Sequence, residues 1–318
     1  MKTRLTEAFG LAHPIVLAPM AKAAGGRLAA AVSHGGGLGL IGGGYGDAAW
    51  IEGAFAEAGN TRVGCGFITW KLAENPEVLE AVLARQPAAL CLSFGDPAPF
   101  AARIHDAGVP LICQVQSLCD AQRAAECGAR VIVAQGSEAG GHGERRGTIT
   151  LVPELADWLA GHSSDTLLLA AGGIADGRGL AAALMLGADG VLMGSRLWAS
   201  AEAEVSHAMT DAAIAATGDA TIRSTVMDAA RGLRWPARYT ARVLRNKVTE
   251  RWHDDPEGLR ADPAARAEWV AGWDAGDPAR ANTFVGEAAG LIHDRPPVAD
   301  LLARISGEAE ALLAGAAG

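Results

Sequence analysis

A single histidine, His142, stands in the glycine-rich stretch SEAGGHGERRG, residues 137–147. An imidazole titrates near neutrality, so it can accept or donate a proton or a hydrogen bond at a substrate. The apolar run just upstream, residues 131–136, is typical of a buried strand. We therefore expect His142 on a flexible loop after that strand. The charged residues that follow it can be solvated or can belong to the site; they are Glu144, Arg145 and Arg146.

Two glycine-rich loops point to a second kind of chemistry. AAGGIADGRG follows one apolar run and GVLMGSR ends the next. Glycines allow the backbone to approach a ligand closely, and N–H groups at the start of a helix favour an anion. These loops predict a phosphate site.

These residues must be positioned by regular elements, and eight short apolar runs alternate with segments of helical periodicity. Continuous apolar runs of this length are typical of parallel strands that are covered on both faces. The helical segments begin after Asp, Ser, Asn or Pro and often end in Gly. The runs are residues 15–20, 38–43, 63–69, 89–94, 110–115, 131–136, 166–173 and 190–195.

Eight strands, each followed by a helix, predict an α/β fold, a closed (β/α)8 TIM barrel, over residues 1–202. Residues 203–318 show no further strand signals. We expect them to form a C-terminal helical extension at the barrel mouth, ending in an amphipathic helix. In such barrels the site lies where the strands end, and the loops after strands seven and eight often hold phosphate. His142 and both glycine loops have such positions. Aromatic residues there can line a pocket or belong to the rim: Tyr45, Trp70 and Phe94.

The composition of the chain excludes several function classes. Its 318 residues carry a net charge of −9 and no basic block, which argues against nucleic acid or an anionic membrane surface as a partner. The chain has no apolar run long enough to span a membrane and no signal-peptide pattern. The five cysteines form no CxxC pair, so we expect reduced thiols in a cytoplasmic protein and no metal site.

The order and spacing of three segments resemble the nitronate monooxygenase family, formerly called 2-nitropropane dioxygenases. The segments are HPIVLAPMAKAAGGRLAAAVSHGGGLGLIGGG, AQGSEAGGH and AAGGIADGRGLAAALMLGADGVLMGSR, within residues 9–200. These enzymes are FMN-dependent TIM-barrel oxidoreductases related to flavin enoyl-acyl-carrier-protein reductases and NADH:quinone reductases. The resemblance implies an FMN cofactor.

Carried over by position, the resemblance makes His142 the catalytic residue. It implies that Ala18, Pro19 and Met20 form a backbone wall beside the isoalloxazine. The remaining implied contacts are Gln114, Gln135 and Gly140 at the flavin ring, and Gly172, Gly173, Gly194 and Ser195 at the FMN phosphate.

The chain departs from the family pattern at several places. Gly66 stands where the family often has an asparagine that meets the flavin. Residues 143–146, GERR, are interposed before Gly147 and Thr148, and the run GGGYGD at 42–47 is individual to this chain. These departures concern the substrate pocket rather than FMN binding.

Together the residues and the resemblance predict oxidation of an alkyl nitronate by O2 to a carbonyl compound and nitrite. One alternative is an NAD(P)H-dependent FMN reductase of enoyl thioesters or quinones. Another is a non-catalytic flavin-binding protein. The expected partners are a small-molecule substrate and O2, and the alanine- and tryptophan-rich C-terminal part could supply the surface of a homo-oligomer.

Overall fold

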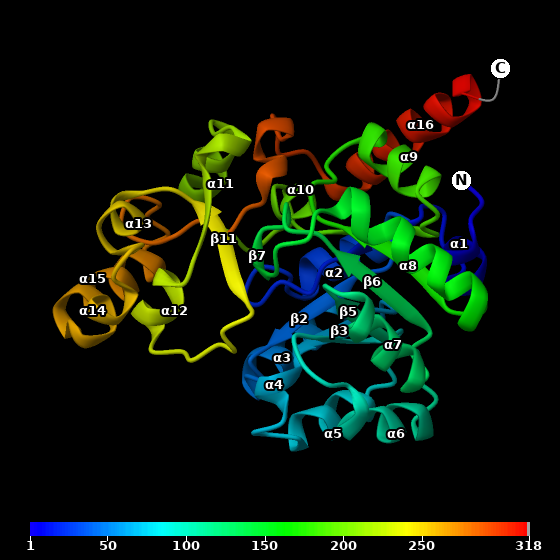
Figure 1. Ribbon diagram of the computed structural model, residues 1–318, viewed down its shortest axis with the longest axis horizontal. Coiled ribbons are helices and arrows are strands. Elements are labelled where there is room, and N and C mark those ends of the chain that lie inside the picture. Colours follow the sequence, from blue (N-terminus) through cyan, green and yellow to red (C-terminus); the bar gives the residue numbers. More distant parts are fainter. Residues whose placement is uncertain (317–318) are drawn as a thin grey trace.

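The computed structural model describes residues 1–316, and its centre is a barrel of eight parallel strands (Figure 1). The strands follow the order β1-β9-β8-β6-β5-β4-β3-β2. A parallel bridge between Val16 and Leu38 joins β1 to the chain just before β2 and closes the barrel. The bounds are β1 Ile15–Leu17, β2 Leu40–Gly44, β3 Gly64–Ile68, β4 Leu90–Ser93, β5 Leu111–Val115, β6 Val131–Gln135, β8 Leu167–Ala171 and β9 Gly190–Met193.

All eight apolar runs are therefore strands, and the predicted TIM barrel is confirmed. Alternation along each strand divides the side chains between two apolar regions. In β8, Leu167 and Leu169 belong to a buried cluster with Val131 and Val133 of β6. The intervening Leu168 packs in the larger cluster that the strands share with the surrounding helices. Both faces of the strands are thus buried, which explains their continuous apolar sequences.

Helices follow the strands as the sequence pattern predicts, and side-chain caps begin several of them. Asp47, Ser117 and Asp176 each accept a hydrogen bond from a backbone N–H three residues later. The helices of this part are α1 Arg4–Phe9, α2 Gly26–His34, α3 Ala48–Ala58, α4 Thr69–Leu72, α5 Glu77–Leu83, α6 Ala98–Asp106, α7 Leu118–Glu126, α8 Thr148–His162, α9 Gly177–Met185 and α10 Ser195–Trp198.

Two expectations about strands were wrong. His142 does not lie on a free loop, because β7, Gly141–Gly143, pairs with β11, Thr240–Leu244. With β10, Thr221–Ser224, these strands form an antiparallel sheet in the order β10-β11-β7. The segment after residue 202 is therefore not wholly helical. A strand of three residues with glycine at both ends has no apolar alternation to reveal it, and its partner lies about a hundred residues later.

Residues 203–295, which we call the cap, fold around this small sheet (Figure 1). They have their own apolar cluster, which includes Met227, Val243 and Trp269. The other cap elements are α11 His207–Ile214, α12 Val226–Arg231, α13 Lys247–Trp252, α14 Pro256–Ala261, α15 Pro263–Asp274 and the 3₁₀ turns η1 Gly218–Ala220 and η2 Glu287–Leu291.

The last helix, α16 Val298–Ala316, departs from the predicted location. It lies against α9 and α2 on the outside of the barrel instead of at the mouth (Figure 1). Val298, Leu302 and Ile305 are fully or almost fully buried in the barrel's larger apolar cluster. The cap is thus inserted between the last barrel strand and the last barrel helix. A domain boundary at residues 202 and 203 stays a prediction.

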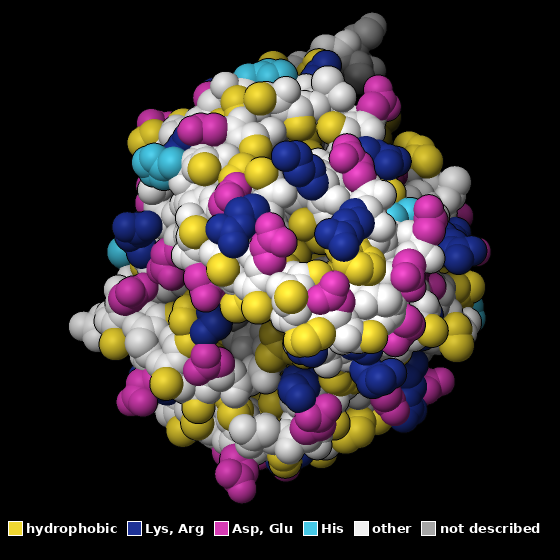
Figure 2. Space-filling view, turned by 90° about the vertical axis from the view of Figure 1, so that its left-hand side faces the viewer, with side chains coloured by type: hydrophobic (Ala, Val, Ile, Leu, Met, Phe, Trp, Pro, Cys, Tyr) yellow, Lys and Arg dark blue, Asp and Glu magenta, His cyan; other side chains and the backbone are white. Residues whose placement is uncertain are grey.

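The surface bears charges of both signs. Lysine and arginine side chains alternate with aspartate and glutamate across the face in Figure 2, around a central hollow. None of the helices within residues 1–316 has the length and apolar character needed to cross a membrane.

Candidate functional site

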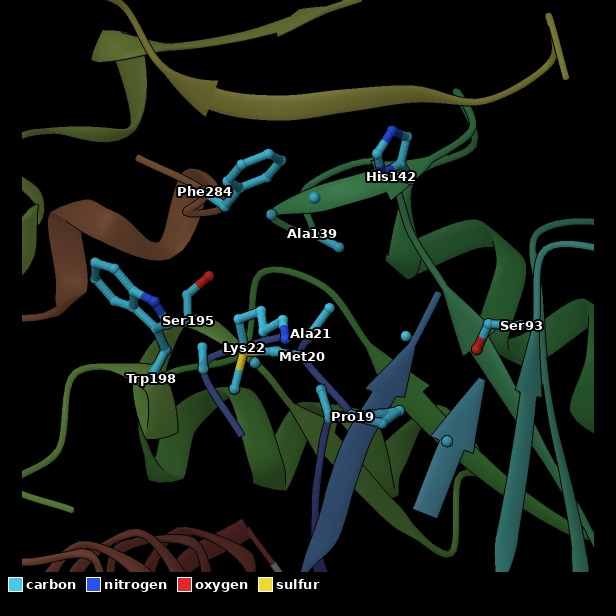
Figure 3. A pocket seen from close by; sticks show the side chains of 18 of the residues that line it. Pro19, Met20, Ala21, Lys22, Ser93, Ala139, His142, Ser195, Trp198 and Phe284 are labelled. Carbon is cyan, nitrogen blue, oxygen red and sulfur yellow. The ribbon is translucent and has the colours of Figure 1, made fainter. Parts of the chain in front are cut away.

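A cavity of about 650 Å³ lies between the C-terminal ends of the barrel strands and the cap. Its size falls in the range usual for small-molecule and cofactor sites. Figure 3 shows Pro19 and Met20 on one side of it and His142 and Phe284 on the opposite side. The structure brings every predicted site residue to this cavity: Ala18, Pro19, Met20, Gln114, Gln135, Gly140, His142, Gly172, Gly173, Gly194 and Ser195.

Ala18, Pro19 and Met20 follow β1 and form one wall of the cavity. Pro19 packs closely on Gly66 in β3, because a Cβ atom at position 66 would lie 2.4 Å from the Pro19 Cγ. An asparagine at this position would collide with the proline ring as it stands. The departure from the family pattern at Gly66 is therefore matched by the position of Pro19.

The two glycine loops meet at the same end of the cavity. Gly172 and Gly173 have φ angles of +99° and +76°, which favour glycine. Successive residues of this kind can turn their N–H groups toward one anion. Gly194 is the N-cap of α10 and Ser195 is its first residue. This helix directly follows β9, the neighbour of β8 in the barrel. This backbone arrangement is suited to hold a phosphate group.

A third segment completes this end of the cavity. The N–H of Gly286 donates to the Ser195 Oγ at 2.9 Å. A hydroxyl that accepts one hydrogen bond still has its own O–H to donate to a ligand. Gly140 lies against the same segment, and a Cβ there would come within 2.6 Å of the Gly286 nitrogen. Glycine at position 140 thus allows the loop after β6 to touch the cap.

Two glutamines connect the barrel to the histidine strand. The Gln135 side chain donates from Nε2 to the carbonyl oxygen of His142 at 3.0 Å. Gln116 in turn donates to the Gln135 Oε1 at 2.7 Å. Gln114 is buried at the end of β5 and lines the cavity independently of this pair. The chain of amides fixes the backbone that carries the imidazole.

The His142 side chain is 8 % exposed and has a carboxylate partner. Its Nε2 lies 2.9 Å from the Asp228 Oδ2, and the other carboxylate oxygen accepts from the Arg231 Nη2 at 2.9 Å. Both partners belong to α12 in the cap. Burial lowers the pKa of His142 below its ordinary value, and the hydrogen bond and charge of Asp228 offset part of this effect.

This environment favours a neutral imidazole with a defined tautomer. Because Asp228 is an acceptor when ionised, the proton of the neutral ring resides on Nε2 and the lone pair on Nδ1. A proton taken up at Nδ1 would create an imidazolium that the carboxylate stabilises. The pair can therefore act as a general base with a stabilising partner.

Aromatic side chains surround the imidazole. The indole of Trp235 stacks on it with ring centres 3.4 Å apart and planes 6° from parallel. Phe94 approaches the imidazole edge-on at 6.3 Å. Tyr45 and Phe94 line the cavity, which is one of the two roles that the sequence left open for them, and Trp70 packs edge-on against Trp235 without lining the cavity. Burial raises the pKa of the Tyr45 hydroxyl, so this group remains a hydrogen-bond donor at neutral pH.

The three charged residues that follow His142 make separate contacts near the surface. Glu144 pairs with Arg238 of the cap, and Arg146 pairs with Glu154 in α8. Arg145 is exposed. None of these three residues lines the cavity among the residues the structure describes.

Sequence reasoning missed the contributions of the cap, above all Asp228, Arg231 and Trp235. One signal was present, because VMDAAR places an acid and a base at i,i+3 spacing in an otherwise apolar helix. A buried charge in such a helix needs a partner. Nothing in the spacing indicated that the partner would be His142, which lies 86 residues earlier.

Comparison with known proteins places the chain among relatives of similar length. The sequence profile of the nitronate monooxygenase family matches residues 68–308, so the match includes the cap and extends well past residue 200. The nitronate monooxygenase npaC of Metarhizium robertsii is 35 % identical over 94 % of this chain and 91 % of its own. A nitronate monooxygenase of Neurospora crassa is 32 % identical over 94 % and 89 %.

Among solved structures, FabK from Thermotoga maritima has the same architecture, with a TM-score of 0.85 and 30 % identity. The alignment covers 100 % of this chain and 99 % of that one. The barrel, the cavity at its strand ends and the family match agree with one another, and this protein is an oxidoreductase that belongs to the nitronate monooxygenase family.

Proposed function

We propose that this enzyme binds FMN in the cavity and oxidises alkyl nitronates with O2 to a carbonyl compound and nitrite. The observation that carries the proposal is the buried His142–Asp228 pair, whose histidine lines the same cavity as the two glycine loops. Family membership supports nitronate oxidation in general. The site residues and the cofactor are proposed from the geometry.

The residues present suit FMN. The backbone of Gly172, Gly173 and Gly194 and the Ser195 hydroxyl would hold the phosphate. Because Gly172 and Gly173 have positive φ and a Cβ at position 172 would lie 2.9 Å from the Gly136 oxygen, a side chain at either position would distort this backbone. Ala18, Pro19, Met20, Gln114, Gln135 and Gly140 would line the ring system. When bound, FMN supplies the electron-accepting and oxygen-reactive group.

The part of the protein is to bind the substrate, orient it and manage its proton. A nitronate is already anionic, and the Arg231 guanidinium, which lines the cavity and pairs with Asp228, would donate a hydrogen bond to its oxygens. A neutral nitroalkane must first lose a proton from the carbon that bears the nitro group. His142 would take that proton at Nδ1 while Asp228 stabilises the resulting imidazolium.

The cofactor proposal is tested by two matched glycine substitutions. Gly173→Ala places a side chain at φ +76° beside Glu138 and should reduce the FMN content of the purified protein. Gly10→Ala, at φ +68° with open space around it and far from the cavity, imposes similar backbone strain and should leave FMN unchanged. Equal FMN content in both variants would contradict the assignment of the phosphate cradle.

The reaction is tested by adding ethyl nitronate to the FMN-loaded protein without oxygen and without NAD(P)H. We expect the visible absorbance of the flavin to fall, and admission of O2 to restore it with release of nitrite. An unchanged spectrum would reject nitronate oxidation.

The alternative is reduction of an enoyl thioester or a quinone by NAD(P)H. The observation that supports this alternative is the similarity to FabK, at 30 % identity over the whole chain. Anaerobic NAD(P)H that bleaches the flavin, where ethyl nitronate does not, would favour this alternative.

A further inference from the structure

We infer that Trp235 determines which substrates reach His142, and that it restricts the enzyme to nitronates with short alkyl chains. This inference rests on the proposed function. Trp235 belongs to the segment 232–239 of the cap, which has no regular secondary structure and connects α12 with β11. Its side chain nevertheless has a defined place in the cavity lining.

The indole of Trp235 occupies a compartment with aromatic walls. Phe94 lies edge-on to it at 5.2 Å, Trp70 at 5.4 Å and Tyr239 at 6.1 Å between ring centres. The Nε1–H donates to the Tyr45 hydroxyl at 3.2 Å. The walls come from the ends of separate barrel strands and from the cap, so the compartment exists only at the assembled site.

The indole also limits the approach to the imidazole. At 3.4 Å between ring centres the stack leaves no space for a substrate between Trp235 and His142. Since Asp228 engages Nε2, Nδ1 is the ring nitrogen left for a substrate. A substituent that extends from the reacting carbon toward the compartment would meet the indole.

The backbone conformation of Phe94 is independent evidence that the compartment is constrained. Its φ of +65° is unusual for an aromatic residue and costs backbone energy. This conformation places its ring against Trp235, Tyr239 and His142 together. The wall of the compartment is thus held in a conformation that the local backbone does not favour.

Removal of the indole should leave a flat, apolar space next to His142. Cavities of this kind bind flat apolar molecules when a large side chain is deleted. Trp235→Ala should therefore accept a nitronate with an aromatic substituent that the parent enzyme excludes. Free indole should fill the space and reverse the change.

The experiment compares three FMN-loaded variants with the parent protein. Trp235→Ala removes the indole, and Trp235→Leu keeps apolar volume in case the first variant folds poorly. Trp158→Ala is the matched control, because Trp158 also stacks on a histidine but lies outside the cavity lining. The measurements are kcat/KM for ethyl nitronate and phenylmethyl nitronate, and the binding of indole and of phenylmethyl nitronate by calorimetry.

We expect the ratio of phenylmethyl to ethyl kcat/KM to rise by about tenfold or more in Trp235→Ala. Indole should bind to this variant and return the ratio toward the parent value. Trp235→Leu should give a smaller rise, and Trp158→Ala none. An unchanged ratio in both Trp235 variants, or no binding of indole to Trp235→Ala, would overturn the inference.

Failure of the proposed function gives a different result. In that case the parent protein oxidises neither nitronate, whereas calorimetry still reports whether indole and phenylmethyl nitronate bind only when Trp235 is replaced. Binding restricted to Trp235→Ala would retain Trp235 as the residue that closes the compartment, and equal binding to the parent protein would reject it.

Discussion

The protein contains two tryptophan–histidine stacks that look alike and differ in every other respect. Trp235 and His142 stack at 3.4 Å with planes 6° apart, and Trp158 and His162 stack at 4.9 Å with planes 7° apart. The second pair is spaced i,i+4 on α8, where neighbouring turns bring such side chains together. The first pair joins a strand of the barrel mouth to the cap. Ring stacking alone therefore carries no functional information.

The partners of the two imidazoles explain the difference. His162 is exposed, and its Nδ1 lies 2.9 Å from the backbone oxygen of Trp158, so its contacts are local to one helix. His142 is buried against the Asp228 carboxylate and faces a cavity. Acid–base chemistry by a stacked imidazole thus requires a carboxylate partner and a neighbouring cavity in addition to the stack itself.

The largest expected difference between the stacks is catalytic. His142→Ala should keep FMN but lower kcat/KM for neutral nitroethane by roughly 100- to 10,000-fold, the usual contribution of a general base. His162→Ala should leave it unchanged. Turnover on ethyl nitronate should fall less, because that substrate needs no proton removal. A His142→Ala enzyme with full activity on both substrate forms would remove His142 from the mechanism.

Loss of the carboxylate charge should have the next largest effect. Asp228→Asn should lower kcat/KM for nitroethane by about 10- to 150-fold, which corresponds to one hydrogen bond to a charged group. A control is Glu154→Gln, which removes the charge of an exposed ion pair with Arg146 and should change little. Equal kinetics for the two variants would show that Asp228 does not support the imidazole.

The pH dependence of stability should report the burial of His142. Burial lowers the pKa of His142 below 6.5, so as pH falls the unfolded chain binds a proton before the folded protein does. The stabilisation from the neutral ring is therefore present above pH 6.5 and is lost as pH falls toward the folded-state pKa. Below pH 6.5 the free energy of unfolding of the wild type, measured with urea, should decrease more than that of His142→Gln. An identical decline would contradict a depressed pKa.

The smallest effect is expected at His162, the exposed member of the outer stack. His162→Ala should change the free energy of unfolding by about 0.5 kcal/mol or less, as is usual for surface positions. Urea denaturation measures this value directly. A loss as large as that of a core residue would mean that the outer stack contributes to the barrel.

The barrel and its glycine loops were predictable because their signals are local. Each apolar run had the length of a buried strand. The positions of Gly172 and Ser195, just after the seventh and eighth barrel strands, follow from counting these strands. The small sheet was not predictable in this way. The pairing of His142 with Ala241 joins β7 to β11, and both strands are short. The arginines in TIRS, which is β10, and in TARVL, which is β11, obscure the alternation of apolar and polar residues in these two strands.

The partner of His142 was missed for a related reason. Asp228 is 86 residues from the histidine, and only the folded cap brings the two together. Trp235 lies in a segment without regular structure, for which periodicity gives no guidance. Single-sequence patterns identify residues that a strand or helix positions alone, but not those positioned by contact between the barrel and the cap.

The insertion of the cap between β9 and α16 has a consequence for how the site opens and closes. Both ends of the cap are anchored in the barrel, so local unfolding of this segment would separate Asp228 from His142 without releasing the chain. Loop-closure entropy rises only slowly with length, and a doubly tethered segment returns to a partner that never diffuses away. The acid–base pair is therefore an intramolecular assembly, and its recovery after a transient opening is independent of protein concentration.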